Sequence, residues 1–315
     1  MQYSHIQRSS RKFGAGLHTT VVEVGPRDGL QNEARVLTPD DKIALIERCV
    51  AAGTRRVEAV SFVNPERVPQ MAGAEEVMAG VPRRDGIAYS GLVLNRRGLD
   101  RALDARVDEV NVVVPASDTF SVRNQGTTVA EMLDAWDGIA AAADDAGVPA
   151  TMTIAVAFGC PFEGDTPPER IEYIARRAHA ASEIALADTI GVGVPAQVRD
   201  LTRRAREAAP GIPLRFHFHN TRNTGYANAL MAVDEGVTVL DASAGGFGGC
   251  PFAPAATGNI ATEDLLYALH RSGHDTGIDM ESTARTGMWL AERLGVPAPS
   301  LLGRAGGFPA SPPER

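Results

Sequence analysis

The sequence predicts an α/β protein, a (β/α)8 TIM barrel with extra C-terminal helices, and two observations lead to this prediction. Eight short runs rich in β-branched residues recur along the 315-residue chain, and their starts lie about 31 residues apart, the size of one βαβ unit. Several runs are almost continuously apolar, as expected of parallel strands buried on both faces. An open, doubly wound sheet is the alternative, but it usually has fewer strands and a GxGxxG motif after the first one, and this motif is absent.

The predicted elements follow one another in a regular order. We expect strands at residues 21–24, 56–62, 87–94, 109–114, 150–158, 183–187, 214–218 and 237–242. The segments between them are expected to form helices at 38–52, 128–146, 167–181, 195–209 and 223–235, followed by two further helices at 262–272 and 280–294. Terminal signals support the first helix, because Thr38 is a suitable N-cap before Pro39 and Gly53 closes the segment.

Composition and charge restrict the kind of protein. The chain is 44% hydrophobic with a formal net charge of −8, so a large core is available and neither a nucleic acid nor an anionic membrane surface is an expected partner. No apolar run approaches the roughly 20 residues of a membrane helix. We expect one barrel domain over residues 19–300, a loose N-terminal arm over 1–18, and a disordered tail rich in Gly and Pro over 301–315.

The N-terminal arm and the cysteines bear on the cellular compartment. The arm is basic but lacks the apolar core of a secretory signal, and an organellar transit peptide is the alternative. Cys49, Cys160 and Cys250 lie far apart and form no CxxC, so neither a disulfide framework nor a thiolate zinc site is expected. A reducing cytoplasm fits both observations best.

Polar residues after the first predicted strand indicate one side of an active site. In a TIM barrel the site is built from the loops that follow the strands. Strand one is followed by Arg27, Asp28 and Gln31, an unusual density of charged and amide groups directly after a buried strand. A simple turn with Asp28 and Gly29 at its centre is the alternative.

Two histidines on the seventh predicted strand indicate a metal site. Successive strand residues point to opposite faces, so His217 and His219 share one face at the end of a strand that enters the barrel mouth. Asp28 lies nearby in a closed barrel, and Asn259 after strand eight adds an amide oxygen. This mixed set suits Mg²⁺ or Mn²⁺ better than a closed zinc site. The alternatives are histidines that hydrogen-bond inside the barrel and an Asn259 that caps the next helix, a role for which Thr262 is better suited.

The glycine-rich segment after strand eight, GGFGGCP, is typical of a mobile loop, with Cys250 at its tip. A phosphate cradle is another interpretation, but no Lys-Ser or Lys-Thr follows the glycines. Closure of the loop would bring Cys250 over the site, whereas a lone cysteine is more often inert packing. For Cys160, which also stands in a Gly-Cys-Pro, we expect a structural role.

Six blocks of the sequence occur in an order that matches a known enzyme family. They are VGPRDGLQNE (24–33), VEAVSFVNPERVPQM (57–71), FGCPFEG (158–164), LADTIGVGVP (186–195), HFHN (217–220) and GGCPFAPAATGNIATEDLLY (248–267). Together they resemble the 3-hydroxy-3-methylglutaryl-CoA (HMG-CoA) lyase family from about residue 21 to 294. The resemblance implies cleavage of a 3-hydroxy-3-alkyl acyl-CoA between C2 and C3 into acetyl-CoA and a ketone or keto acid. The GGCP block favours the lyases over the condensing synthases of the same superfamily.

The resemblance also implies a role for each site residue. The family's metal ligands fall on Asp28, His217, His219 and Asn259, its catalytic arginine on Arg27, its loop cysteine on Cys250, and further acidic positions on Glu58 and Asp188. The metal would lower the pKa of the substrate hydroxyl, and Asp188 or His217 would accept its proton. Arg27 would stabilise the enolate, and Cys250 would protonate it. Because a metal-bound histidine is a poor base, Asp188 is favoured over His217.

Some positions depart from the family pattern around the acyl pocket. Residues 220–223 read Asn-Thr-Arg-Asn where the family commonly has Asp-Thr-Tyr-Gly, Ala34 stands where a lysine is usual, and Thr153 and Ala185 align with a substrate-contacting tyrosine and serine. We expect substrate contacts from Gln31, Thr153, Arg123, Arg222 and Asn220.

Several points of function stay open at this stage. The resemblance implies a homodimer that acts on an acyl-CoA, and a place in leucine catabolism. The open alternatives are a lyase acting on a different 3-hydroxyacyl-CoA, an acetyl-CoA-condensing synthase, and a barrel that only binds acyl-CoA.

Overall fold

Eight parallel strands close into a barrel, which confirms the predicted fold class. The computed structural model describes residues 18–249 and 258–309. The barrel strands are β1 (Thr20–Glu23), β2 (Arg56–Ser61), β3 (Ala88–Val93), β4 (Glu109–Pro115), β5 (Ala150–Ala155), β8 (Glu183–Asp188), β9 (Leu214–Phe218) and β10 (Val239–Ala242). Their order is β1-β10-β9-β8-β5-β4-β3-β2, so the first strand pairs with the last. Each of the eight predicted strands is present within a few residues of its expected bounds.

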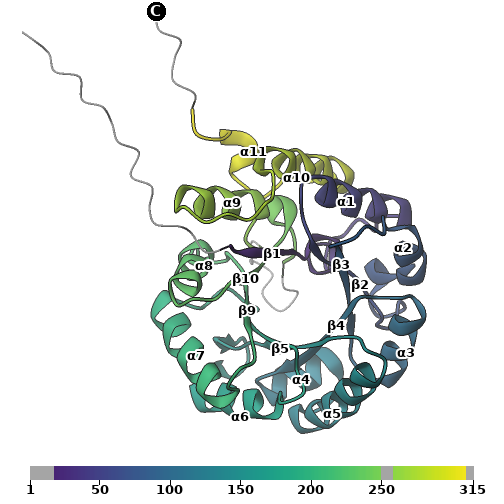
Figure 1. Ribbon diagram of the computed structural model, residues 1–315, viewed down its shortest axis with the longest axis vertical. Coiled ribbons are helices and arrows are strands. Elements are labelled where there is room, and N and C mark those ends of the chain that lie inside the picture. The colour runs from purple at the N-terminus through teal and green to yellow at the C-terminus, as the bar shows by residue number, and fades with distance from the viewer. Residues whose placement is uncertain (1–17, 250–257, 310–315) are drawn as a thin grey trace, which may run out of the picture.

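A ring of helices covers the barrel, as the view along its axis shows (Figure 1). The helices are α1 (Pro39–Ala51), α2 (Ala74–Gly80), α3 (Arg96–Asp104), α4 (Asp118–Gln125), α5 (Val129–Asp145), α6 (Pro168–Arg177), α7 (Pro195–Ala208), α8 (Gly225–Asp234), α9 (Thr262–Arg271), α10 (Met280–Leu294) and α11 (Leu302–Ala305). Short turns η1 (Gly25–Gly29), η2 (Pro69–Met71) and η3 (Ala244–Gly246) and a small hairpin of β6 (Gly159–Cys160) and β7 (Gly164–Asp165) complete the described part.

The predicted N-terminal signal of α1 is confirmed, whereas α9 begins after Ala261 without the expected cap from Thr262. The Thr38 side chain accepts a hydrogen bond from the Asp41 amide and so caps α1. Thr128 and Glu131 form a capping box at the start of α5. Helices α2, α3 and α4 are not among the predicted helices; each is short, with seven, nine and eight residues.

The C-terminal helices pack beside β1, where the chain closes the barrel (Figure 1). The short helix α11 is held there, because the backbone amides of Leu301 and Leu302 donate to the Asp264 carboxylate at 2.9 and 2.7 Å. The expectation of disorder from residue 301 onward is therefore wrong for α11. The division into arm, barrel and tail otherwise stays a prediction, since residues 1–17 and 310–315 lie outside the described part.

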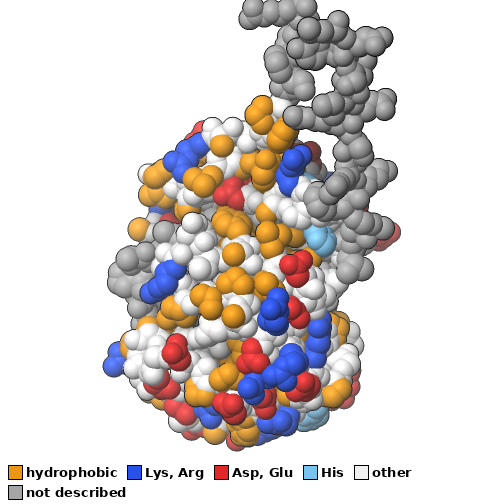
Figure 2. All heavy atoms as spheres, turned by 90° about the vertical axis from the view of Figure 1, so that its left-hand side faces the viewer, with side chains coloured by type: hydrophobic (Ala, Val, Ile, Leu, Met, Phe, Trp, Pro, Cys, Tyr) orange, Lys and Arg blue, Asp and Glu red, His pale blue; other side chains and the backbone are white. Residues whose placement is uncertain are grey.

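The outer faces of the strands form the main hydrophobic core with the helices. Phe216 and Phe218 point outward from β9 and stack at 5.3 Å between ring centroids, and Trp136 of α5 is fully buried. The surface is mixed in character: on the flank seen in Figure 2, side chains of both charge signs lie among hydrophobic ones. No described helix is long and apolar enough to span a membrane.

The barrel interior contains a layer of charged side chains at the amino ends of the strands, which we call the lower layer. It consists of Arg56, Glu109, Glu183 and Arg215. The Arg56 guanidinium lies 2.7 Å from a Glu109 oxygen and 3.0 Å from a Glu183 oxygen, and Arg215 lies 3.5 Å from Glu183. The lower layer closes the floor of the barrel, so the open end is the carboxyl end of the strands.

Candidate active site

A cavity of about 900 Å³ occupies the carboxyl end of the barrel. Arg27 and Asp28 on η1 and His217 and His219 on and after β9 line its inner part. Thr153 lines the opposite wall, on β5. This is the end at which TIM barrels carry their active sites.

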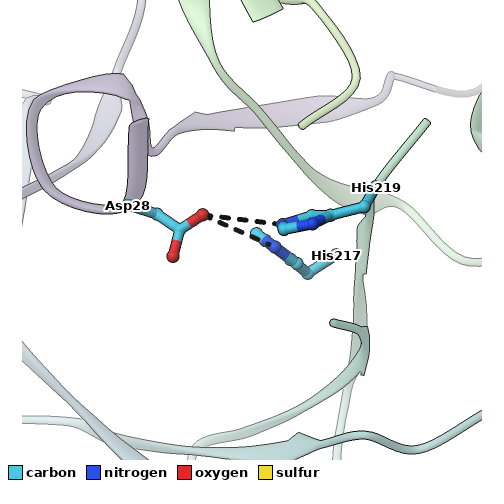
Figure 3. A group of neighbouring side chains, drawn as sticks. All are labelled: Asp28, His217 and His219. Carbon is cyan, nitrogen blue, oxygen red and sulfur yellow. Dashed lines mark ion pairs between the residues drawn. The ribbon is translucent and has the colours of Figure 1, made fainter. Parts of the chain in front are cut away.

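Asp28, His217 and His219 converge at the inner end of this cavity (Figure 3). The Asp28 Oδ2 atom lies 3.8 Å from the Nε2 atom of each histidine, and one ligand atom from each residue falls within 4.8 Å of the others. A distance of 3.8 Å is too long for a hydrogen bond but leaves room for a cation between the three side chains. The structure therefore brings together three of the four predicted metal ligands as a possible metal-binding triad.

Asn259 joins this triad. Its Nδ2 atom donates to Asp28 Oδ2 at 2.8 Å and to the Phe247 carbonyl at 2.9 Å, while its Oδ1 atom is buried and accepts no hydrogen bond from any described residue. A buried carbonyl oxygen without a donor is costly unless a cation or water satisfies it. Asp28, His217 and His219 thus fit a divalent cation, and the unpartnered Asn259 Oδ1 is the atom through which Asn259 would add a fourth ligand. Asn259 does not cap α9, since Ala261 is the residue before that helix.

The loop after β10 approaches this cluster very closely at Gly248. The residue has a φ of +111°, and a Cβ there would lie 2.4 Å from Asn259 Nδ2 and 2.9 Å from the Asp28 carbonyl. Only glycine fits both the conformation and the space. The glycine-rich sequence is therefore explained in part by packing against the predicted ligands.

Charges around the cluster favour an ionised Asp28. Burial alone would raise the pKa of Asp28, but the charge of Arg27 and the neighbouring imidazoles outweigh it and hold this pKa well below its usual range. Burial would lower the pKa of His217, whereas its hydrogen bond to Asp241 and the charge of Asp28 raise it. The His217 Nδ1 atom lies 3.2 Å from Asp241 Oδ2, which directs the other ring nitrogen, Nε2, toward Asp28.

Arg27 is held on both sides. Its Nη1 donates to Asp28 at 2.8 Å, and its Nε donates to Glu58 Oε2 at 2.7 Å, with a further bond from Nη2 to the same oxygen. The register of β2 against β3 shifts between Glu58 and Val60, a bulge of the kind that re-aims side chains near active sites. Arg27 thus lines the cavity with Glu58 directly behind it, and a catalytic role for either stays a prediction.

Asp188 does not face the cavity. In the register of β8 with β9, Ala187 is opposite His217, so Asp188 points to the outer side of the barrel wall with Phe218. Its two oxygens accept backbone hydrogen bonds from Val192 and Gly193 at 2.8 and 2.9 Å. Burial raises the pKa of Asp188 despite these bonds. In this arrangement Asp188 holds the loop after β8.

The predicted substrate contacts divide into two groups. Gln31 and Thr153 line the cavity. Arg123 instead covers the Phe162 ring at 4.2 Å, and Arg222 donates to the carbonyls of Ile190 and Gly191. The Asn220 side chain accepts from the Gly225 amide at the start of α8. These last three predicted residues are not among those that line the described cavity.

Sequence reasoning missed two groups of cavity residues. Asn111 and Asp241 are buried polar residues with apolar neighbours on both sides in β4 and β10, and polarity inside an apolar run is the signal that could have identified them. Arg67 and Arg97 lie at the exposed rim of the cavity, and neither has a carboxylate within ion-pair distance in residues 18–249 and 258–309. No sequence signal distinguishes these arginines from other exposed ones.

The cysteines take different positions. The Cys160 thiol is buried and lies 3.0 Å from Ser117 Oγ, in agreement with a structural role. Cys250 lies outside the described residues. Its neighbour Gly249 lines the cavity, and its carbonyl accepts a hydrogen bond from Asn32 at 2.7 Å.

The chain is a closed (β/α)8 barrel with a cavity at its carboxyl end. Acidic, imidazole and guanidinium groups surround this cavity, an arrangement typical of TIM-barrel enzymes. Comparison with known proteins gives the family. The HMGL-like family model matches residues 18–289, so the chain belongs to the HMGL-like family, and it is a carbon–carbon lyase.

Three similar proteins support this family over most of the chain. The (R)-citramalyl-CoA lyase of Chloroflexus aurantiacus is 44% identical over 91% of this chain and 94% of its own length. The hydroxymethylglutaryl-CoA lyase of Pseudomonas mevalonii is 40% identical, covering 90% and 95% of the two chains. A solved HMG-CoA lyase from Acinetobacter baumannii, in complex with coenzyme A and 3-methylmalate, superposes with a TM-score of 0.90 at 37% identity, covering 95% and 98%.

Proposed function

We propose that this protein is a divalent-metal-dependent lyase that cleaves an HMG-CoA-like 3-hydroxyacyl-CoA between C2 and C3 and releases acetyl-CoA and a keto acid. The observation that carries the proposal is the convergence of Asp28, His217 and His219 beside Arg27 inside one large cavity. The named relatives, which are acyl-CoA lyases, support the substrate class.

Asp28, His217, His219 and Asn259 would hold the cation, and the mixed oxygen and nitrogen set suits Mg²⁺ or Mn²⁺. When bound, such a cation supplies Lewis-acid polarisation of the substrate's hydroxyl and carboxylate oxygens. Asp241 behind His217 and Arg27 beside Asp28 hold two of these side chains in place. Both contacts are of the kind that orients metal ligands.

Arg27 would stabilise the charge that develops during bond cleavage. As the hydroxyl loses its proton, C3 becomes a carbonyl carbon, and the electrons of the C2–C3 bond move onto the thioester as an enolate. A guanidinium fixed by Glu58 and Asp28 presents its charge without reorganisation, which is most effective in a buried site. Arg27 is only 8% exposed.

Two residues compete for the role of the base that accepts the hydroxyl proton. His217 lines the cavity, but a nitrogen that binds a cation cannot accept a proton at the same time. Asp188 would have to leave the amides of Val192 and Gly193 and turn into the cavity. Measuring the metal affinity of variants distinguishes a metal ligand from a residue that acts only on the proton. We expect His217→Gln to lose metal affinity and Asp188→Asn to keep it.

Cys250 would donate the proton that converts the enolate into acetyl-CoA. The position of Gly249 on the cavity wall supports this proposal. Cys250→Ala should abolish cleavage and leave metal binding intact, and unaffected cleavage would remove Cys250 from the mechanism.

The anionic CoA portion would enter at the rim that contains Arg67 and Arg97, rather than at Arg123 or Arg222. Cations without carboxylate partners on the described surface are available to phosphate groups. Gln substitutions at Arg67 and Arg97 should raise KM for the acyl-CoA and leave kcat nearly unchanged. The same substitutions at Arg123 and Arg222 serve as matched controls.

The acyl substituent has two candidates. An HMG-CoA-like side chain agrees with most named relatives, and a citramalyl-CoA-like side chain is favoured by the 44% identical relative. The short side chain of Thr153 agrees with a pocket that differs from that of the HMG-CoA lyases. We also propose a cytoplasmic homodimer, with a role in leucine catabolism only if HMG-CoA is the substrate.

The decisive experiment is a panel of 3-hydroxyacyl-CoA substrates with Mg²⁺ or Mn²⁺, in which release of acetyl-CoA is followed. Cleavage of HMG-CoA or citramalyl-CoA that stops with EDTA and returns with metal supports the proposal. No cleavage of any member, with condensation of acetyl-CoA and a keto acid instead, would identify a synthase.

A further inference from the structure

A line of hydrogen bonds connects Arg27 to the opposite wall of the barrel. Glu58, which holds Arg27 through Oε2, accepts a second bond through Oε1 from Asn111 Nδ2 at 2.7 Å. The Asn111 Oδ1 atom in turn accepts from the Thr153 hydroxyl at 2.7 Å. We call Glu58, Asn111 and Thr153 the Arg27 support chain. It runs from β2 across β4 to β5, and its three residues occupy inward positions.

The support chain leaves little freedom to its members. Glu58 and Asn111 are 2% and 3% exposed, so each unpaired polar atom there would carry a desolvation cost. The carboxylate at one end and the hydroxyl at the other fix which way the Asn111 amide points. Glu58 therefore has one oxygen committed to Arg27 and the other to Asn111, and its side chain cannot rotate without breaking both contacts.

Thr153 takes a different place in this arrangement from the one predicted. Its single hydroxyl proton is donated to Asn111, so it cannot also donate to substrate. The next inward residue toward the barrel floor on β5, Thr151, instead lies 3.5 Å from Glu183 in the lower layer. Two threonines on one face of one strand thus serve different ends of the barrel.

We propose that Asn111 and Thr153 are positioning residues that act through Glu58 to hold the Arg27 guanidinium where negative charge develops. This inference rests on the proposed function, in which Arg27 stabilises the enolate. It predicts an effect on kcat rather than on substrate affinity, because the interaction of Arg27 strengthens in the transition state.

The test uses near-isosteric variants and steady-state kinetics with the substrate that the wild-type protein cleaves. Thr153→Val replaces the hydroxyl with a methyl group of similar size, and we expect kcat to fall about 10-fold with KM changed less than about 3-fold. Asn111→Leu leaves Glu58 Oε1 unpartnered, and we expect kcat to fall about 100-fold. Thr153→Ser should restore kcat to within about 2-fold of wild type. Thr151→Val, on the same face of β5, is the matched control and should leave kcat within about 2-fold.

A double variant tests whether Thr153 acts only through Asn111. If Thr153 acts only through Asn111, the Thr153→Val and Asn111→Leu variants combined should be no slower than Asn111→Leu alone. Multiplicative losses, a rise in KM at constant kcat, or an unchanged kcat in Thr153→Val would each overturn the inference. Thermal unfolding of each variant excludes misfolding as the cause. A wild-type protein that cleaves no acyl-CoA would instead be a failure of the proposed function.

Discussion

The inside of the barrel has charged side chains at both ends, and the two ends differ in how these charges are partnered. In the lower layer, Arg56 donates to both oxygens of Glu109 and both oxygens of Glu183. At the mouth, Asp28 and the two histidines stand 3.8 Å apart, and the Asn259 oxygen has no donor among the described residues. The charges of the lower layer are ion-paired within the chain, with only the Arg215 Nε proton lacking a hydrogen-bond acceptor among the described residues, whereas the mouth retains capacity for a ligand.

This difference separates charges that build the fold from charges that do chemistry. A buried charge is tolerated only when it is paired, and the lower layer meets that condition within the chain. The mouth meets it only in part, which is typical of functional sites. The contrast leads to four predictions.

The largest effect is expected from Asp28→Asn. The substitution keeps the shape of the side chain but removes the negative charge that faces both histidines, so metal affinity and activity should each fall by at least about 100-fold. Isothermal titration with Mn²⁺ and acetyl-CoA release measure the two quantities. An undiminished metal affinity would show that the mouth is not a metal site.

Arg56→Met should reduce the stability of the protein but not its metal affinity. It leaves Glu109 and Glu183 without their shared cation, and the free energy of unfolding should fall by about 3 kcal/mol, as measured by urea denaturation. The metal affinity of the folded variant should stay within about 3-fold of wild type. Loss of metal affinity with full stability would contradict the division between the two ends.

Glu23 lies behind the mouth, with its carboxylate oxygens accepting from the Gly25 and Ala244 amides and the Thr262 hydroxyl. Burial raises the pKa of Glu23 from 4.5 to about 7 despite these bonds. Between these values the folded state binds more protons than the unfolded state, so this contribution to stability is present below pH 4.5 and lost as the pH rises through about 7.

Glu23→Gln should remove that dependence. Between pH 5 and 7 the free energy of unfolding of the wild type should decline relative to the variant by about 2 kcal/mol. Urea denaturation at several pH values gives both curves, and Glu263, whose pKa burial also raises to about 7, contributes equally to each. If the free energies of unfolding of the wild type and Glu23→Gln ran parallel between pH 5 and 7, the raised pKa of Glu23 would be contradicted.

The smallest effect is expected from Asn32→Ala. This change removes an exposed hydrogen bond to the Gly249 carbonyl, next to Cys250, so kcat should fall only about 3-fold while metal affinity is retained. Gln31→Ala, the neighbouring substitution, should instead raise KM, because Gln31 lines the cavity. If Asn32→Ala and Gln31→Ala changed kcat and KM to the same extent, separate roles for Asn32 and Gln31 would be contradicted.

Periodicity in the sequence predicts most of the fold and the core of the site. The spacing of apolar runs places all eight strands, and the alternation of side chains puts His217 and His219 on one face. The same alternation could not orient Asp188, because the face that it occupies depends on the register of β8 against β9. Asn111 stands in the run VNVVV, whose apolar character predicts a strand buried on both faces and does not single out one polar side chain.

Long polar side chains are harder to place from sequence. In the structure Arg123 covers a ring and Arg222 donates to two loop carbonyls, and a substrate contact from either stays a prediction. An arginine reaches several ångströms from its backbone, so its partner depends on tertiary neighbours that local sequence does not define. The short Asn220 amide instead satisfies the nearest backbone group, the Gly225 amide, and its contact with substrate also stays a prediction.

The pairing of β1 with β10 has a consequence for how the protein folds. Asp28 and Asn259 are 231 positions apart in the chain, and their contact forms only when the last strand docks beside the first. Contacts of such long range are slow to form, so we expect them among the last steps of folding. A cation bound there would stabilise only the completed barrel. The rate at which a refolding chain binds the cation would therefore report the rate at which β10 pairs with β1.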